Sequence, residues 1–287
     1  MKKAVLALLF GAATMVVLVA VQGCGVLGGP PIGVLVSAGP GDSDTTVLLS
    51  WTVPSEGAAD KYMVWFDSVG GTGYTVVGET TGNSFVHNPH GVTGHYKVTA
   101  VFGGNSYDAA DKPSTIPAHS AEIELFEINA DSSKCGFGWS RDSGIGHAYA
   151  MTESANCAHV DFYVSDFQVG FGNPQYPLCI ASPNKADSID AGAIGIVPRA
   201  NWRSNGFSDP QSDPQSPVIA YDTAPFTYHI YTQILTNPCY IACYTAGDSS
   251  TLKNYVLIQV DSSNITTGKV WLQTWYQLVS GLRLVRH

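Results

Sequence analysis

The chain has 287 residues, with 14 Lys and Arg against 23 Asp and Glu, and a formal net charge of −9 at pH 7. This acidic balance argues against nucleic acid or anionic lipid as the main partner, because both require Lys and Arg to neutralise phosphates. Only 13% of the residues are charged, and short apolar runs alternate with Gly, Pro, Asn and Asp. That texture predicts an all-β protein, and the length predicts two domains.

Residues 1–23 follow the order of a secretory signal. Lys2 and Lys3 precede an apolar run over residues 4–21, and the small residues Gly23 and Cys24 follow it. The run is near the lower limit of a membrane-spanning helix, roughly 17 to 25 residues. A retained transmembrane anchor is therefore the alternative to a cleaved signal peptide.

The segment "VQGC" at residues 21–24 resembles the lipobox of bacterial lipoproteins, whose cysteine becomes the lipidated first residue of the mature chain. This resemblance implies that Cys24 is lipidated and that the protein resides in the bacterial cell envelope, at the outer membrane or the cell surface. A cysteine of this family carries several acyl chains, which hold a protein more firmly than one. Residues 24–31 end in two prolines and are expected to form a tether.

Residues 32–117 contain short alternating runs that predict a seven-stranded sandwich. The clearest of them span residues 46–54, 61–66, 74–78, 83–87 and 95–102.

Trp51, Tyr62 and the run Tyr96-x-Val98-x-Ala100 resemble the pattern of fibronectin type III domains. The resemblance implies that Tyr96 is the tyrosine-corner residue and that residues 111–117 begin the last strand. It also implies a spacer or binding module, a fold that brings no chemistry of its own.

Three histidines of this domain, His87, His90 and His95, lie close together in the sequence. A structural metal site needs about four ligands, and no acidic or thiol ligand accompanies the three imidazoles. We therefore expect solvated loop residues and predict neither a metal site nor a cofactor.

Residues 121–287 are expected to form a second, antiparallel β-rich domain, so the predicted fold is a fibronectin type III-like β-sandwich followed by that domain. The repeated "SDPQ" at residues 208–217 predicts an exposed loop, because its prolines cannot donate hydrogen bonds. The last strands are expected to form an antiparallel meander. Strands are predicted at residues 121–128, 159–167, 191–198, 226–235, 239–247, 254–262 and 268–278.

Trp271 and Trp275 lie on one side of the last predicted strand. The pair either packs into the core or forms a platform for sugar rings, as amphipathic aromatic side chains do at exposed sites.

The order of this second half also resembles the β-rich domain of haemophore-like surface lipoproteins, on residues 136–139, 159–164, 254–260 and 269–277. Some members of that family hold haem between two histidines. The resemblance implies ligand capture, with His147, His159 and His229 as candidate residues, although none aligns with a known ligand position.

Five cysteines remain if Cys24 is lipidated, and an odd number leaves at least one thiol free or paired between chains. An exported protein permits disulfides, so we expect one or two. Cys239 and Cys243 are too far apart on an extended strand to bond each other. The candidates are Cys135, Cys157, Cys179, Cys239 and Cys243.

Neither a G-x-S-x-G elbow nor an H-E-x-x-H motif occurs in the sequence, so we expect no enzyme activity. The sequence predicts a membrane-anchored exported lipoprotein that acts as a binding or adhesion module for an extracellular protein or carbohydrate. Capture of haem or carbohydrate by the C-terminal domain is the alternative. An exported hydrolase without a recognisable motif is a third hypothesis.

Overall fold

The structure is a computed structural model that describes residues 28–40, 45–185, 201–212, 228–246 and 253–285. The expected signal peptide, Cys24, the start of the tether, the strand expected at 191–198 and the second half of the "SDPQ" loop lie outside these residues. Within the described part, no helix is long and apolar enough to cross a membrane. The fold is all-β, as predicted, and the described residues include three short 3-10 helices, η1 (Ser132–Lys134), η2 (Ser154–Ala158) and η3 (Pro183–Lys185).

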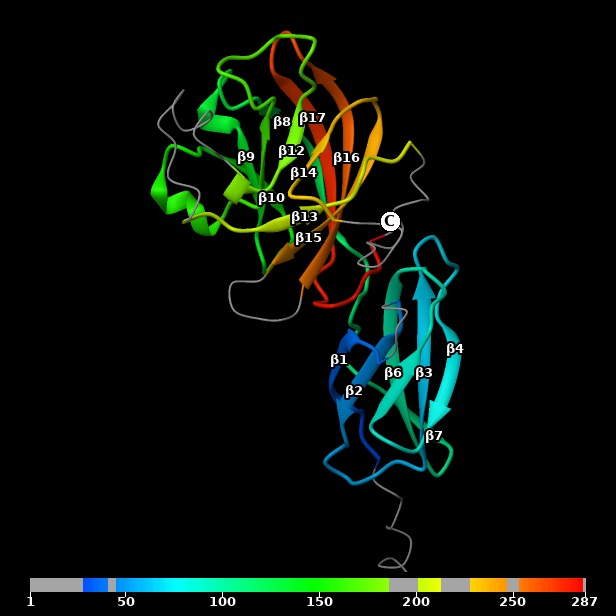
Figure 1. Ribbon diagram of the computed structural model, residues 1–287. Helices are drawn as coiled ribbons and strands as arrows, with labels where there is room; N and C mark the ends of the chain where they lie inside the picture. Colours follow the sequence, from blue (N-terminus) through cyan, green and yellow to red (C-terminus); the bar gives the residue numbers. More distant parts are fainter. Residues whose placement is uncertain (1–27, 41–44, 186–200, 213–227, 247–252, 286–287) are drawn as a thin grey trace, which may run out of the picture.

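The first part of the chain is a fibronectin type III-like sandwich of two antiparallel sheets (Figure 1). One sheet has the strand order β1-β2-β5 and the other β4-β3-β6-β7. The strands are β1 (Ile32–Ala38), β2 (Val47–Thr52), β3 (Lys61–Ser68), β4 (Thr75–Thr80), β5 (Ser84–His87), β6 (Gly94–Phe102) and β7 (Asn105–Asp108).

Alternation of side chains along the strands builds the core of this sandwich. Trp51 on β2 and Tyr62 on β3 are both buried, with ring centroids 5.2 Å apart. Tyr96, Val98 and Ala100 on β6 are fully buried in the same cluster. The residues that carried the fibronectin type III resemblance therefore form the sandwich core.

The environment of Tyr96 differs from the expected tyrosine corner. That motif bonds the tyrosine hydroxyl to the backbone, whereas the Tyr96 hydroxyl lies 2.8 Å from Nδ1 of His87. His87 is accordingly half-buried rather than solvated, and burial, with a smaller contribution from His90, lowers its pKa. His90 is exposed in a turn, as expected, whereas His95 is exposed but lies on β6 rather than in the loop.

The last strand of the sandwich comes earlier than the resemblance implied. β7 pairs with the end of β6, before residues 111–117 begin. The later segment instead pairs with the start of β6, where the amide of Tyr96 donates to the carbonyl of Pro113 at 2.8 Å and that of Thr115 to Gly94 at 2.9 Å. Both segments line the same edge of β6, with an interruption between them.

The second part of the chain forms two five-stranded sheets. Their orders are β10-β9-β11-β12-β14 and β13-β15-β16-β17-β8, and every pairing between these strands is antiparallel. β15, β16 and β17 form the predicted meander. The strands are β8 (Ala118–Phe126), β9 (Gly136–Trp139), β10 (Gly146–Tyr149), β11 (Phe162–Ser165), β12 (Cys179–Ala181), β13 (Asn205–Phe207), β14 (Tyr231–Gln233), β15 (Cys239–Ala246), β16 (Lys253–Asn264) and β17 (Lys269–Tyr276).

A core of apolar side chains lies between these two sheets. Phe137 and Phe162 from one sheet meet Ile258 and Leu272 from the other, and all four are fully buried. Each strand supplies its inward face to this layer because successive side chains point to opposite sides.

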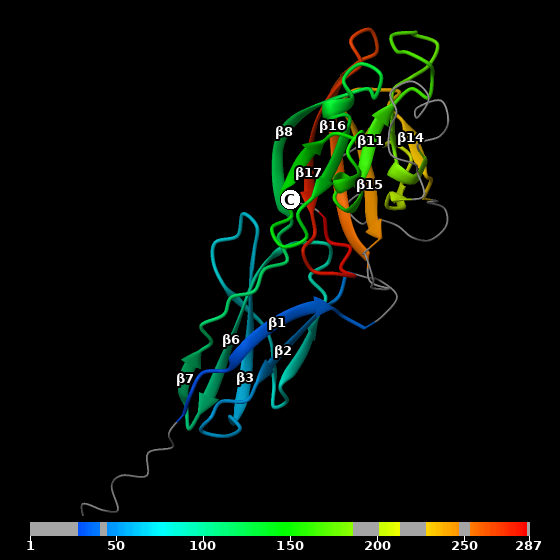
Figure 2. The same ribbon diagram turned by 90° about the vertical axis from the view of Figure 1, so that its left-hand side faces the viewer.

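The two β-units lie end to end, and the segment after β17 returns to the junction between them (Figures 1 and 2). Leu282 and Leu284 of this segment are fully buried in the core of the first sandwich. The side-chain amide of Gln277 donates to the carbonyls of Thr115, at 2.9 Å, and Leu284, at 2.5 Å. The C-terminal residues therefore complete the first unit, which a linear division of the chain at residues 117–121 did not anticipate.

Candidate ligand-binding site

Two glycines shape the outer surface of strand β9. The run "GFGW" directs Phe137 and Trp139 into the core, so Gly136 and Gly138 take the opposite face. The segment after η2 crosses this face so closely that a Cβ on Gly138 would collide with the carbonyl oxygen of His159. Glycine at position 138 thus allows the loop that carries His159 to lie on the sheet.

This crossing segment brings one fully buried carboxylate, that of Asp161, against two arginines. Arg141 donates two hydrogen bonds to this carboxylate in a bidentate arrangement, from Nη2 to Oδ1 at 2.6 Å and from Nη1 to Oδ2 at 3.1 Å. Nη1 of Arg203 lies 3.2 Å from Oδ1. A buried carboxylate needs such partners, since leaving it unpaired costs several kcal/mol.

Further hydrogen bonds fix the position of this cluster. The amide of Trp139 donates to Oδ2 of Asp161 at 3.0 Å, and the side chain of Asn205 donates to the Asp161 carbonyl at 2.7 Å. Burial lowers the pKa of Arg141, but the charge of Asp161 outweighs it and raises that pKa overall, so the guanidinium stays charged. The two arginines, which lie just outside β9 and β13, are therefore held through the buried carboxylate of Asp161.

The arginines open onto a cavity of about 500 Å³ on the outer side of β9 and β10. His147 and His159, two of the histidines predicted as ligand residues, both line it. Tyr149 lies beside His159, with parallel rings whose centroids are 5.9 Å apart. The described residues that line this cavity include no carboxylate. We call this cavity the arginine–histidine pocket.

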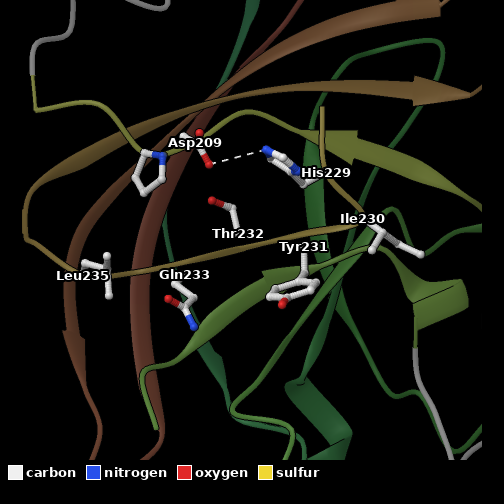
Figure 3. Close-up of a pocket in the computed structure, with 8 residues that line it drawn as sticks. Asp209, His229, Ile230, Tyr231, Thr232, Gln233 and Leu235 are labelled. Carbon is white, nitrogen blue, oxygen red and sulfur yellow. Dashed lines mark ion pairs between the residues drawn. The ribbon is translucent and has the colours of Figure 1, made fainter. Parts of the chain in front are cut away.

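The third predicted histidine, His229, lies in a separate pocket of about 380 Å³. Figure 3 shows its imidazole facing Asp209, with Thr232 nearby. Nε2 of His229 and Oδ1 of Asp209 are 3.6 Å apart, which exceeds a hydrogen-bond length, and the two side chains are 45% and 76% exposed. Such an exposed pair does not hold an imidazole in a fixed orientation.

The two tryptophans of β17 do not form an open platform. Trp275 is 5% exposed, and the ring of His119 stacks on it at 4.8 Å. It packs in a small outer cluster with Tyr255 and Val285, on the side of the sheet away from the main core. Trp271 is half-buried, with the ammonium of Lys269 5.7 Å from its ring.

The five cysteines among the described residues are free thiols, in place of the expected disulfides. Cys239 and Cys243 occupy one strand, β15, four residues apart, so their side chains insert into the core at separate points. Burial raises the pKa of the Cys135 and Cys179 thiols to about 12 and that of Cys239 to about 11. Thiols with such pKa values behave as apolar core residues. The five free cysteines are Cys135, Cys157, Cys179, Cys239 and Cys243.

Sequence reasoning named His147 and His159, which the structure brings to one pocket, but did not name Arg141, Asp161 and Arg203. In the run "HVDFYV", Asp161 and Tyr163 alternate with Val160, Phe162 and Val164. In the structure both faces of this strand are buried. An acidic residue within an otherwise apolar run was the available signal, since a buried carboxylate requires basic partners.

The comparisons with known proteins add little. No protein-family model matches the chain, and no curated protein matches it. Solved structures that match include "Crystal Structure of FN3tt", at 20% identity and a TM-score of 0.24, over 30% of this chain and 91% of that one. A two-domain fibronectin type III segment of chicken tenascin matches at 14% identity and a TM-score of 0.24, over 81% of this chain and 91% of that one. Titin kinase with its flanking domains matches at 11% identity and a TM-score of 0.27, over 89% of this chain and 38% of that one.

Proposed function

We propose that this chain is an exported lipoprotein, anchored through Cys24 in the bacterial cell envelope, that binds an extracellular ligand with its C-terminal β-domain. The fibronectin type III-like sandwich serves as the spacer between anchor and binding domain. Ligand binding without catalysis is the activity that fits the described residues, because the His229–Asp209 pair is exposed and burial raises the pKa of the thiols, including that of the half-exposed Cys157.

The path of the chain through the first sandwich is the observation that supports this proposal. Gly28 packs against Phe102 and Tyr107, at the β6–β7 end of the sandwich. The chain leaves toward β8 beside Gly94, at the other end of β6. Nine residues of strand separate these ends by about 26 Å. An anchor on the N-terminal side would thus hold the second unit away from the membrane surface.

Ligand capture by the C-terminal domain, of haem or of carbohydrate, is favoured over adhesion through a flat surface by one observation. His147 and His159, which are distant in sequence from Arg203, converge with it on one pocket. Pockets with a few convergent polar groups are the usual form of small-ligand sites.

The anchor is tested by comparing the fractionation of the wild-type protein and a Cys24→Ala variant in the bacterial host. The wild type is expected in the membrane fraction and to incorporate labelled palmitate. Cys24→Ala is expected to lose the label. Cys157→Ala, which alters the half-exposed cysteine of η2, is the matched control and should behave as wild type.

Equal palmitate incorporation by Cys24→Ala and wild type would refute the lipoprotein assignment. Membrane retention of an unlabelled wild-type protein would instead favour a retained transmembrane segment at residues 4–21.

A further inference from the structure

We infer that the arginine–histidine pocket binds a sugar-sized anionic ligand, with its carboxylate or sulfate group at the arginines and its ring against Tyr149 and His159. The inference names the ligand class of the binding function proposed above and rests on it. An anionic sugar is thus preferred over a neutral carbohydrate or an extracellular protein as the ligand of this pocket.

The charge of the pocket contrasts with that of the protein. The formal net charge of the chain is −9, yet the described lining carries the guanidiniums of Arg141 and Arg203 and the imidazoles of His147 and His159. Asp161, the carboxylate that contacts both arginines, lies beneath them and is fully buried. It orients the guanidiniums without presenting its own charge to the cavity. A concave site lined by one sign of charge concentrates ligands of the opposite sign.

Preorganisation distinguishes this site from a surface patch of basic residues. The side chains of Arg141 and Arg203 are 29% and 11% exposed, and both are tied to the same carboxylate. Arg141 also lies over the ring of Tyr276, 5.8 Å from its centroid. Arginines fixed in this way lose little side-chain entropy when an anion binds.

The size and the aromatic wall of the cavity indicate more than a free inorganic ion. About 500 Å³ exceeds the space needed for a sulfate or phosphate and is within the range of small-molecule sites. Tyr149 and the exposed His159 form a stacked pair at its side. Such a pair offers an amphipathic face to a sugar ring, while the arginines receive the acid group.

The inference is tested by calorimetric titration of the purified full-length protein at pH 7 and constant ionic strength. D-glucuronate and glucose 6-sulfate are the acidic probes, D-glucose is the neutral counterpart, and sodium sulfate is the free anion. At least one acidic sugar is expected to bind with a Kd in the millimolar range or below, at least tenfold more tightly than glucose. Sulfate is expected to compete with it. The titration uses purified protein without a membrane, so a failure to bind these probes would not change the interpretation of the anchor experiment.

Variants of the exposed lining residues locate the binding without disturbing the buried cluster. His159→Ala removes one face of the wall and is expected to weaken acidic-sugar binding about fivefold. His147→Ala is expected to weaken it as well. His229→Ala, in the separate pocket of Figure 3, is the matched control and should bind as wild type.

Four results would overturn the inference, three of which involve measurable binding. These are equal affinity for glucose and glucuronate, binding of sulfate without binding of either acidic sugar, and a loss on His229→Ala as large as that on His159→Ala. The absence of binding by every probe would overturn it also.

Discussion

Gly138 shows at the scale of one residue how the pocket depends on the absence of a side chain. The carbonyl of His159 occupies the space that a Cβ would need, and because it is backbone it can retreat only if the whole segment moves. Asp161 follows His159 closely, so such a movement would also disturb the carboxylate that holds the arginines.

We predict that Gly138→Ala lowers the free energy of unfolding by about 1 to 3 kcal/mol, as overpacked sites do. It should also weaken the binding of acidic sugars. Gly82→Ala is the control, since the nearest atom to its added Cβ is 3.6 Å away and its backbone is unstrained. Urea denaturation followed by tryptophan fluorescence measures the free energy of unfolding of both variants. A Gly138→Ala protein as stable as Gly82→Ala would show that the loop does not lie on β9 as described.

Glu127 is a second residue whose burial has a measurable consequence. Its carboxyl group is fully buried and accepts hydrogen bonds from the amides of Asn129, at 2.7 Å, and Ala130, at 3.1 Å. Burial raises its pKa, the nearby charge of Asp166 raises it further and the hydrogen bonds lower it, with a net pKa of about 7. The folded protein therefore keeps a proton that the unfolded chain releases near pH 4.5.

Because the folded state binds more protons over this range, stability is predicted to fall as the pH rises from about 4.5 through about 7. Glu127→Gln cannot ionise and should lack this loss. Relative to wild type, the variant is expected to gain on the order of 3 kcal/mol between pH 4.5 and pH 8. Urea denaturation of both proteins at several pH values measures the difference. Parallel pH profiles for the two proteins would mean that folding does not raise the pKa of Glu127.

At the scale of elements, Asp161 joins segments that are far apart in the sequence. Its carboxylate contacts the end of β9, Arg141 in the β9–β10 turn and Arg203 ahead of β13. The cluster thus links the two sheets of the C-terminal domain at one edge, since β9 and β13 belong to different sheets.

Asp161→Asn is predicted to destabilise the protein by about 3 to 5 kcal/mol, because it leaves the half-buried Arg141 without its carboxylate. Asp142→Asn removes an exposed carboxylate from the same turn and should change stability by less than about 0.5 kcal/mol. Thermal unfolding compares the two variants. An equally small effect of both would indicate that the cluster is solvated.

Strands could be predicted from the sequence more readily than the residues of the pocket. Alternation predicted the longer strands of both units, such as β6 and β17, because their inward positions carry apolar side chains, as with Val98 and Leu272. It did not predict β1, β7 or the short strands β9, β10, β12 and β13. Arg141 and Arg203 escaped prediction because neither lies in a motif. They meet only because two sheets pack and a glycine admits the segment of His159. Sites made by packing leave no local spacing in the sequence to read.

At the scale of the whole molecule, the C-terminal segment fastens the two units together. Leu282 and Leu284 are fully buried in the core of the first sandwich, whereas Leu278, shortly before them, is 41% exposed. The proposed spacer function requires such a junction, because a loose joint would not hold the second unit in a fixed direction.

Leu284→Ala is predicted to destabilise the first sandwich by about 2 to 5 kcal/mol, although the residue belongs to the end of the chain. Hydrogen exchange of amides in β2 and β6 should accelerate in this variant. Leu278→Ala is the matched control and should leave those amides protected. Unchanged protection in Leu284→Ala would mean that the segment does not insert into this core.

The central claim, that the chain is an exported binding protein held by a lipid at Cys24, is tested most directly by the mass of the native protein. Mass spectrometry of material extracted from bacterial membranes is expected to show a mature chain that begins at Cys24 and carries the added mass of acyl chains. A native chain that retains Met1, or one whose Cys24 has no lipid, would contradict the account.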